Sequence, residues 1–117
     1  MKKLLFIAVL FVLLLSKISY AQTTGDTLTA TFRVNGNPPC KANIEATVTA
    51  KAGVLSAEWD ATSKDLTVTY VEATIPLRGI HSALAMAGYD TSLLRAKQYA
   101  YDALPTDCIY QRDPITE

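Results

Sequence analysis

The sequence is poor in the residue types from which catalytic and metal sites are commonly built. Its 117 residues include one histidine and two cysteines, and no Ser/His/Asp set occurs in a recognisable context. No glycine-rich phosphate-binding loop is present. A thiol without a neighbouring resolving cysteine makes a poor oxidoreductase. We therefore expect a protein that is not an enzyme.

The sequence also lacks a surplus of charge of either sign. Its 11 Lys and Arg residues balance 11 Asp and Glu residues. Three of the basic residues, Lys2, Lys3 and Lys17, lie in an N-terminal segment that we expect to be removed, which leaves 8 basic against 11 acidic residues, a net charge of −3. A mildly acidic domain without a Lys/Arg cluster argues against nucleic acid and anionic lipid as partners.

The N-terminal segment has the parts of a secretory signal peptide. Two lysines precede an unbroken apolar run, Leu4 to Leu15, and small residues at positions 19 and 21 suit a peptidase that cuts after Ala21. A membrane anchor is the alternative, but the run is shorter than the roughly 20 residues that a span needs. Lys17 also interrupts it, and no cysteine follows to carry a lipid. We expect cleavage of residues 1–21, export, and no membrane span in the mature chain.

Apolar periodicity and breaker residues predict a small α+β domain. Strand-like patterns occur at residues 28–34, 54–60, 65–71 and 89–94. Helical spacing of apolar residues occurs at 40–52 and 76–88, and a short third helix is predicted at 95–104. The order strand–helix–strand–strand–helix–strand is typical of a ferredoxin-like βαββαβ fold, with a four-stranded antiparallel sheet and two helices on one face.

These elements divide the chain into four parts. The signal peptide at 1–21 is followed by a polar leader at 22–27, one domain at 28–94, and a C-terminal helical extension and tail at 95–117. The 96 residues that cleavage would leave suffice for one small domain. The breaker cluster at 35–39 predicts a loop that presents Cys40 at the start of the first helix.

Several segments of the mature chain resemble the heavy-metal-associated domains of copper chaperones, mercury-binding periplasmic proteins and metal-pumping ATPases. The resemblance runs from Leu28 to Thr91. It rests on a loop ending in Cys40 and on the segments Lys41, Ile44-Glu45, Gly53-Val54, Val68-Thr69-Tyr70, Ile80 and Ala87-Gly88-Tyr89-Asp90. The resemblance implies the ferredoxin-like fold, Cu(I) or another soft metal ion as cargo, and a metal-transport protein as partner.

The extension resembles that of a secreted bacterial subgroup of these domains, whose members end in Leu-Pro-x-Cys-Cys-x-Tyr. Here the segment reads Leu104-Pro105-Thr106-Asp107-Cys108-Ile109-Tyr110, and the Ile80-His81 and Tyr89-Asp90-Thr91 segments are also similar. This likeness favours the periplasm as the outer compartment, with extracellular release as the other destination.

Both cysteine pairs of the family pattern are reduced to one member. The family loop has cysteines at the positions of Asn37 and Cys40, and the extension has them at Asp107 and Cys108. Asn37 offers only a hard amide oxygen, which is a poor Cu(I) ligand. The loop therefore resembles a degenerate one-cysteine form of a metal-binding loop.

Three states of the two remaining cysteines are open. Cys40 and Cys108 can form a disulfide, which export and an even cysteine number favour. They can instead bind a soft metal as a two-thiolate site, with His81 or a partner molecule as a further ligand. In the third state the thiols are free or bridge two chains.

The remaining candidates are expected to be structural. The histidine should be exposed or half-buried beside the apolar stripe of the second predicted helix, and Trp59 should pack against the sheet. Tyr99 and Tyr101 are expected to pack against the domain. Three acidic residues fit no calcium-loop spacing and are expected to be solvated turn residues: Asp60, Asp65 and Asp90.

The sequence therefore predicts an exported domain that binds or carries a soft metal ion through its one-cysteine loop. The alternative is a structural or interaction domain without metal, stapled by a Cys40–Cys108 disulfide.

Overall fold

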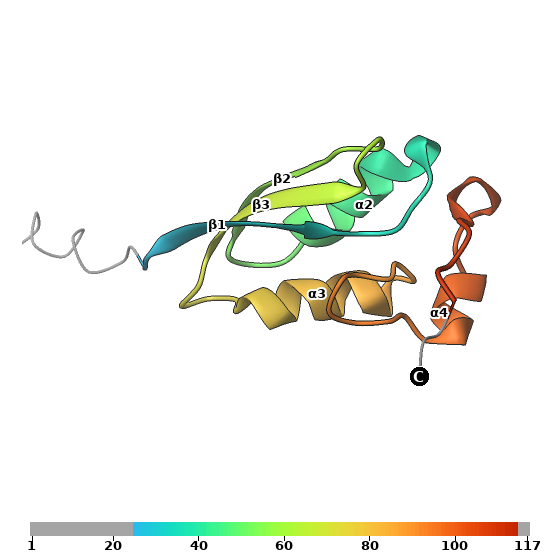
Figure 1. Cartoon of the computed structure of the whole chain (residues 1–117). Coiled ribbons are helices and arrows are strands. Elements are labelled where there is room, and N and C mark those ends of the chain that lie inside the picture. Colours follow the sequence, from blue (N-terminus) through green and yellow to red (C-terminus); the bar gives the residue numbers. More distant parts are fainter. Residues whose placement is uncertain (1–24, 115–117) are drawn as a thin grey trace, which may run out of the picture.

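The computed structural model describes residues 25–114 (Figure 1). The predicted signal peptide and residues 22–24 of the predicted polar leader lie outside the described residues. Within the described part of the chain, no helix has both the length and the apolar character needed to cross a bilayer.

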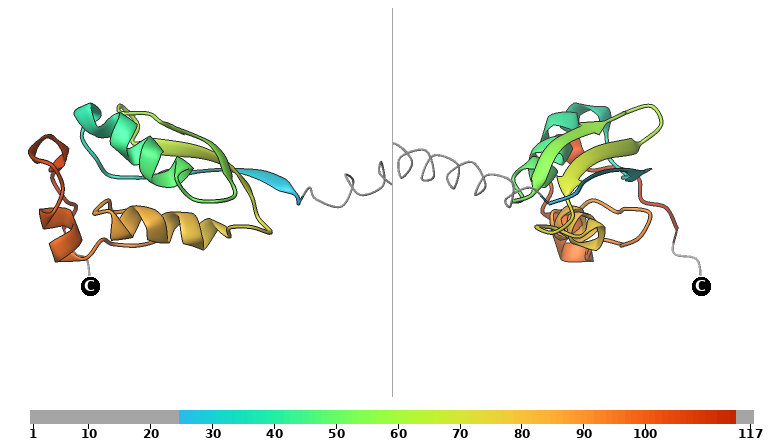
Figure 2. Two further views of the ribbon diagram at one scale, coloured as in Figure 1. Left: turned by 180° about the vertical axis from the view of Figure 1, so that it is seen from behind. Right: turned by 90° about the vertical axis from the view of Figure 1, so that its left-hand side faces the viewer.

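An antiparallel sheet with two helices on one face forms the body of the domain (Figures 1 and 2). The elements in chain order are β1 (Thr27–Arg33), η2 (Pro38–Cys40), α2 (Lys41–Thr49), β2 (Val54–Trp59), β3 (Asp65–Val71), α3 (Leu77–Met86), α4 (Gln98–Asp102) and η3 (Thr106–Cys108). Between residues 25 and 114 the sheet has three strands in the order β1-β3-β2. Figure 1 shows α4 and the C-terminal tail at the end of the domain where α2 begins.

Strand alternation decides which face of the sheet is buried. On β3 every second residue faces the helices and is buried, namely Leu66, Val68 and Tyr70. Their core partners on the helices include Ile44 and Val48 of α2 and Ile80 and Leu84 of α3, all fully buried. The predicted strand pattern at 65–71 and the apolar stripe of the second predicted helix are therefore confirmed.

Trp59 is a core residue, as the sequence predicts. Its side chain is fully buried, and the indole Nε1 donates hydrogen bonds to the carbonyl oxygens of Val34 (3.0 Å) and Lys64 (3.1 Å). A buried indole N–H needs such a partner to offset the loss of water. The tryptophan thus connects the end of β2 to the loop that follows β1.

The predicted fourth strand at 89–94 is wrong. This segment contributes only an isolated bridge between Thr91 and Val34. The Thr91 Oγ1 accepts hydrogen bonds from the backbone N–H groups of Leu93 (3.2 Å) and Leu94 (3.0 Å), and the Thr91 N–H donates to the Leu94 carbonyl (2.8 Å). These bonds close a turn that ends the pairing with β1, because a threonine side chain can replace ladder hydrogen bonds locally.

Gly88 permits both the end of α3 and the approach of α4. Its φ of +107° lies in the region that L side chains rarely adopt. A Cβ at this position would lie 2.6 Å from the Ala100 carbonyl oxygen of α4. Glycine is therefore required here for the extension to pack closely against the domain.

A buried ion pair holds the tail against the turn after α3. Arg112 donates from Nη2 to Asp90 Oδ1 (2.6 Å) and from Nε to Oδ2 (2.9 Å), and the Ala96 N–H donates to Oδ1 (2.7 Å). Burial alone would raise the pKa of Asp90, but the hydrogen bonds from Arg112 and Ala96 outweigh it and lower that pKa. The expectation that Asp90 is a solvated turn residue is wrong, because its side chain is buried and paired with Arg112. The pairing is not evident from the local sequence, because Arg112 lies 22 residues away in the chain. Asp60 and Asp65 are exposed, as predicted.

Tyr110 occupies the centre of the contact between tail and domain. Its hydroxyl donates to the Gly88 carbonyl (2.9 Å) and accepts from the Asp90 N–H (2.8 Å), and burial raises the pKa of the phenol. Tyr101 packs edge-on against its ring at 5.1 Å. Tyr99, in contrast, is 77% exposed, so the expectation that it packs against the domain is wrong.

Replacing Arg112 by methionine should destabilise the fold strongly, because the Asp90 carboxylate would stay buried without its cation. Removing one partner of a buried pair typically costs about 3–5 kcal/mol, and we expect the free energy of unfolding in urea to fall by that order. Lys51→Met, at an exposed position, serves as the control and should change it by less than about 0.5 kcal/mol. A loss in Arg112→Met no larger than in the control would contradict this role.

The same pair predicts a sensitivity to acid. Because the folded-state pKa of Asp90 is lowered, its contribution to stability is present above the unfolded-state pKa of about 3.9 and is lost as the pH falls through the lower folded-state value. In Arg112→Met the unpaired buried carboxyl should titrate above its ordinary value, so that its contribution reverses sign. Urea unfolding at a series of pH values checks this; equal slopes for both proteins in acid would count against it.

Candidate functional site

The loop before α2 is stiff and presents Cys40 at the helix start. Pro38 and Pro39 occupy the first positions of η2, and the Cys40 N–H donates to the Asn37 carbonyl (2.9 Å). Proline fits at these positions because its missing N–H would have no partner there. Cys40 then serves as the N-cap residue of α2.

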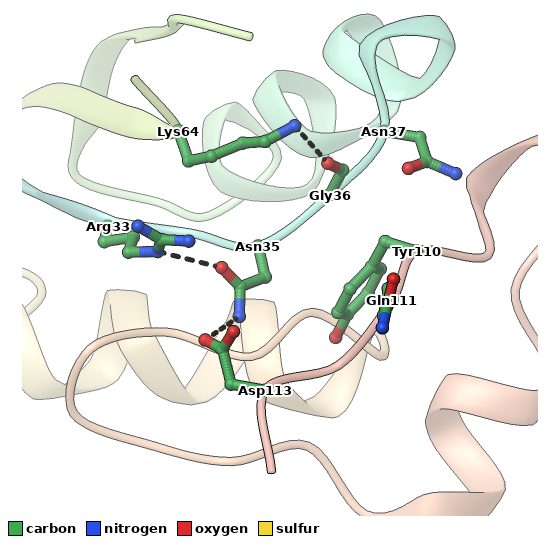
Figure 3. A pocket seen from close by; sticks show the side chains of 8 residues that line it. All are labelled: Arg33, Asn35, Gly36, Asn37, Lys64, Tyr110, Gln111 and Asp113. Carbon is green, nitrogen blue, oxygen red and sulfur yellow. Dashed lines mark hydrogen bonds between the residues drawn. The ribbon is translucent and has the colours of Figure 1, made fainter. Parts of the chain in front are cut away.

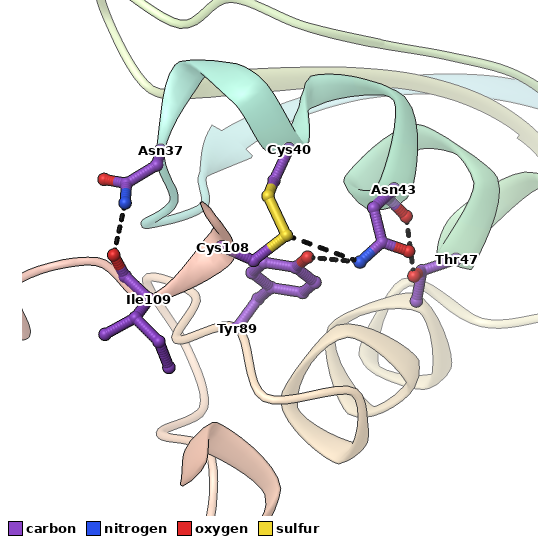
Figure 4. Close-up of a disulfide and its surroundings, with 7 residues drawn as sticks. All are labelled: Asn37, Cys40, Asn43, Thr47, Tyr89, Cys108 and Ile109. Atoms are coloured by element: carbon purple, nitrogen blue, oxygen red, sulfur yellow. Dashed lines mark hydrogen bonds between the residues drawn. A yellow bond between two sulfur atoms is a disulfide. The ribbon is translucent and has the colours of Figure 1, made fainter. Parts of the chain in front are cut away.

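Cys40 forms a disulfide with Cys108, which lies in η3 of the tail (Figure 4). The two Cα atoms are 5.4 Å apart, and the residues are 68 positions apart in sequence. Both side chains are buried, at 3% and 4% exposure. The disulfide alternative is therefore the state that the structure has, and in this state neither sulfur is a thiolate that can bind a metal.

Asn37 holds the tail at a second point. Its side-chain amide donates to the Ile109 carbonyl, one residue beyond the disulfide (Figure 4). Asn37, which stands where the resembling domains have the first cysteine of their loop, thus has a hydrogen-bond partner in the extension. The bond and the disulfide together fix the tail across the loop.

Asn43 and Tyr89 complete the surroundings of the disulfide. The Asn43 Nδ2 donates to the Tyr89 hydroxyl (2.7 Å) and lies 4.0 Å from the Cys108 sulfur (Figure 4). Burial raises the pKa of Tyr89, and the hydrogen bond from Asn43 opposes that shift. Sequence reasoning did not identify Asn43, because nothing in the sequence marks a partner 46 residues away.

Lys41 fixes the first turn of α2 against β2. Its Nζ lies 2.7 Å from Glu45 Oε2 and 2.8 Å from Glu58 Oε1, and it donates to the Trp59 carbonyl (2.7 Å). Glu45 Oε2 also accepts the Trp59 N–H (2.8 Å). Burial would raise the pKa of Glu45, but the bonds from Lys41 and Trp59 lower it. These bonds position the helix start that carries Cys40.

His81 is not grouped with the cysteines. Its Nδ1 is 2.7 Å from the Thr91 Oγ1, and its ring stacks on Phe32 at 3.9 Å between centroids. The side chain is buried. Burial lowers the pKa of His81, and the positive charge of Arg78 lowers it further by a smaller amount. The expected exposed or half-buried position is therefore wrong. Among residues 25–114, no group of three or more His, Cys, Asp and Glu side chains could hold a metal ion.

A polar pocket of about 190 Å³ lies where the loop meets the tail (Figure 3). Its lining includes Arg33, Asn35, Lys64 and Asp113. Asn35 accepts from Arg33 Nε (3.0 Å) and donates to Asp113 Oδ2 (3.0 Å), and the Lys64 Nζ donates to the Gly36 carbonyl (2.8 Å). These groups are largely engaged with one another, so the pocket is a polar gap between the loop and the tail.

The fold is similar to those of solved heavy-metal-associated domains. The chain is similar to a CopZ metallochaperone (23% identity, TM-score 0.52, over 55% of this chain and 98% of that one). It is also similar to oxidized MerP from Ralstonia metallidurans (25% identity, TM-score 0.55, over 57% and 96%). A third is the water-soluble region of the P-type ATPase CopA from Bacillus subtilis (21% identity, TM-score 0.54, over 59% and 47%). No family model and no curated protein matches the sequence.

Removing the disulfide should lower stability without abolishing the fold of the sheet. In the chain-entropy model, a crosslink between residues 68 positions apart contributes about 4 kcal/mol. We expect the double variant Cys40→Ala with Cys108→Ala to unfold roughly 15 to 30 °C below the wild type, which follows from the usual scaling for a domain of this size. Reductant should lower the melting temperature of the wild type but not of the variant.

Equal melting temperatures for wild type and double variant would show that the tail is held by its noncovalent contacts alone. Circular dichroism in the far ultraviolet provides the control that the variant retains the sheet and the helices.

Proposed function

Because the described part of the chain has the fold of heavy-metal-associated domains, we propose that the protein binds one soft metal ion, such as Cu(I), through the thiols of Cys40 and Cys108. The observation that supports this most directly is the meeting of both sulfurs at the start of α2. The pair would then exist as a disulfide when oxidised and as a dithiol when reduced. The protein would act as a carrier rather than an enzyme.

The chemistry of the dithiol suits a soft ion. Two thiolates prefer Cu(I) over hard cations, and the partial positive charge of a helix N-terminus lowers the pKa of a thiol placed there. Cys40 has that position at α2. Asn37 cannot replace a second thiolate, so the second ligand in this proposal comes from the tail, as Cys108.

Reduction of the disulfide must precede binding. It takes two electrons and two protons from a thiol reductant, which itself becomes a disulfide, and yields two free thiols. Metal binding then displaces the thiol protons, so that affinity should rise with pH. The tail has further contacts to the domain, Asp90–Arg112 among them, that would keep Cys108 near Cys40 after reduction.

We also propose export, by the predicted signal peptide, to the periplasm, and a metal-transport protein as the partner that gives or takes the ion. The composition of the N-terminal segment and the resemblance of the extension to the secreted subgroup support export. The similarity in fold to a metallochaperone and to the water-soluble region of a P-type ATPase supports a metal-transport protein as the partner.

A second candidate function is that of an interaction domain that binds no metal and whose Cys40–Cys108 disulfide is never reduced. The bond from Asn37 to the Ile109 carbonyl favours it, because the residue at the position of the first family cysteine here holds the tail. In an oxidising compartment a buried disulfide persists. The two candidates differ in whether the crosslink is ever opened in use.

The metal site is tested by titrating reduced protein with Cu(I) in competition with a coloured Cu(I) chelator. We expect one ion per chain in the wild type and a loss of at least about tenfold in affinity, or 1.4 kcal/mol, in both Cys40→Ser and Cys108→Ser. Asp107→Ser, at an exposed neighbour of Cys108, is the matched control and should bind as the wild type does. Unchanged binding in either cysteine variant would contradict the two-thiolate site.

Restoring the family loop gives an independent test. Asn37→Cys, made together with Cys108→Ser, should create a loop site that binds Cu(I) with at least about tenfold higher affinity than Cys108→Ser alone. If the two proteins bind equally, the rigid Pro38-Pro39 turn does not permit the geometry of the family loop.

Export and the resting state are tested by the intact mass of protein purified from the outer compartment without reductant. We expect the mass of residues 22–117 less two hydrogens, because cleavage after Ala21 and the disulfide each leave a defined mass change. A retained N-terminal segment would contradict the predicted cleavage. A mass with both thiols reduced would contradict a disulfide resting state.

A further inference from the structure

The outer edge of β1 has no neighbouring strand over most of its length. The sheet order places β1 at one edge and β2 at the other. The turn at Thr91 ends the segment that would otherwise cover β1, and only Val34 forms a bridge with it. Among the residues that the structure describes, the stretch from Thr27 to Thr31 is therefore a free strand edge.

The directions of the backbone groups can be assigned from the ends of β1. Val34 donates its N–H to Lys64 on the side of β3, whereas the carbonyl of the preceding residue, Arg33, accepts the Ser92 N–H on the opposite side. Backbone N–H and C=O groups alternate in direction along an antiparallel strand. The groups that point away from β3 consequently belong to Thr27, Thr29 and Thr31.

The two edges of the sheet differ in their protection. The β2 edge is interrupted by a bulge between Val54 and Ser56 and carries the exposed Glu58, both of which oppose pairing with another strand. The β1 edge has no bulge, proline or charged residue from position 27 to 31. An unprotected edge of this kind is a template for strand addition.

We propose that this edge pairs antiparallel with β1 of a second copy of the chain, with the two-fold axis at Thr29. In a two-fold pairing centred on Thr29, each residue that faces a given position of the second copy is faced by that same position in return, so the threonines of the segment Thr27-Leu28-Thr29-Ala30-Thr31 meet one another. Thr29 then faces Thr29 of the second copy, and Thr27 faces Thr31. The Thr29 pair and the two symmetry-related Thr27–Thr31 pairs all use the backbone groups that point away from β3.

The side chains match in this register. Threonine pairs already bridge β1 and β3 on the open face of the sheet, Thr29 to Thr69 at 3.2 Å and Thr31 to Thr67 at 3.1 Å between hydroxyls. Pairing at Thr29 would continue this ladder into the second copy. On the other face, Leu28, which is 38% exposed, lies opposite the small Ala30.

Helix α3 runs in the same direction as β1, because it follows Val71, which pairs with Thr27, and precedes Thr91, which bridges to Val34. Figure 1 shows the N-terminal part of β1 extending past the start of α3. A two-fold axis at Thr29 therefore sends the α3 helices of the two copies away from each other. The paired stretch is short compared with the 20–30 residues a side of stable complexes, so the expected state is a concentration-dependent equilibrium of monomer and dimer.

Sedimentation equilibrium of the exported protein, at concentrations up to about 1 mM where a weak dimer is still populated, tests the proposal. The average mass of the wild type should rise with concentration towards twice the monomer mass. Thr29→Lys places two like charges opposite each other and should weaken dimerisation at least tenfold. Thr67→Lys, on the same face of central β3, loses a similar threonine hydrogen bond and should dimerise as the wild type does.

Thr29→Pro is a second variant, because the N–H that it removes points away from β3 and is needed only for pairing between copies. It should also remain monomeric, with circular dichroism as the control for folding. A wild type that stays monomeric up to about 1 mM overturns the proposal, and leaves the edge to a strand of a different protein. A Thr29→Lys variant that dimerises as the wild type does overturns it equally.

Discussion

The covalent bond between Cys40 and Cys108 holds the C-terminal tail across the loop that begins α2. In a heavy-metal-associated fold this loop is the place where a metal ion would be expected, and here it is covered. In the oxidised form the loop has no free thiol, because Cys40 is buried in the disulfide, and Asn37 is bonded to the Ile109 carbonyl. Under the proposed function, metal binding would therefore depend on the redox state of this one bond.

The tail also explains why the sheet stops at three strands in the described part. The residues after α3 do not continue along β1, because Asp90 turns inward to meet Arg112 and Thr91 closes a turn. Backbone ladder bonds are exchanged for a buried ion pair and for the hydroxyl of Tyr110. The loss of a strand and the docking of the tail are thus two aspects of one rearrangement, and the free edge of β1 follows from both.

Local patterns in the sequence were sufficient for the elements whose burial is periodic. The alternation at 65–71 predicted β3, and the helical stripe before Gly88 predicted α3, because each depends on neighbours within one turn or one pleat. The errors arose where a residue's partner is remote. Nothing near Asp90 indicates a cation 22 positions later. Three states of Cys40 (disulfide, metal ligand, and free or intermolecular thiol) stayed open, because its partner is 68 positions away.

The position of the disulfide also divides the chain topologically. Residues 40–108 form a closed covalent ring that contains α2, β2, β3, α3 and α4. A protease that cuts any bond within the ring leaves one connected molecule, so its folded state can survive a nick. β1 lies outside the ring and is joined to it by a single covalent path through Gly36. Among the strands of the described sheet, β1 is thus the one that a single cut could detach.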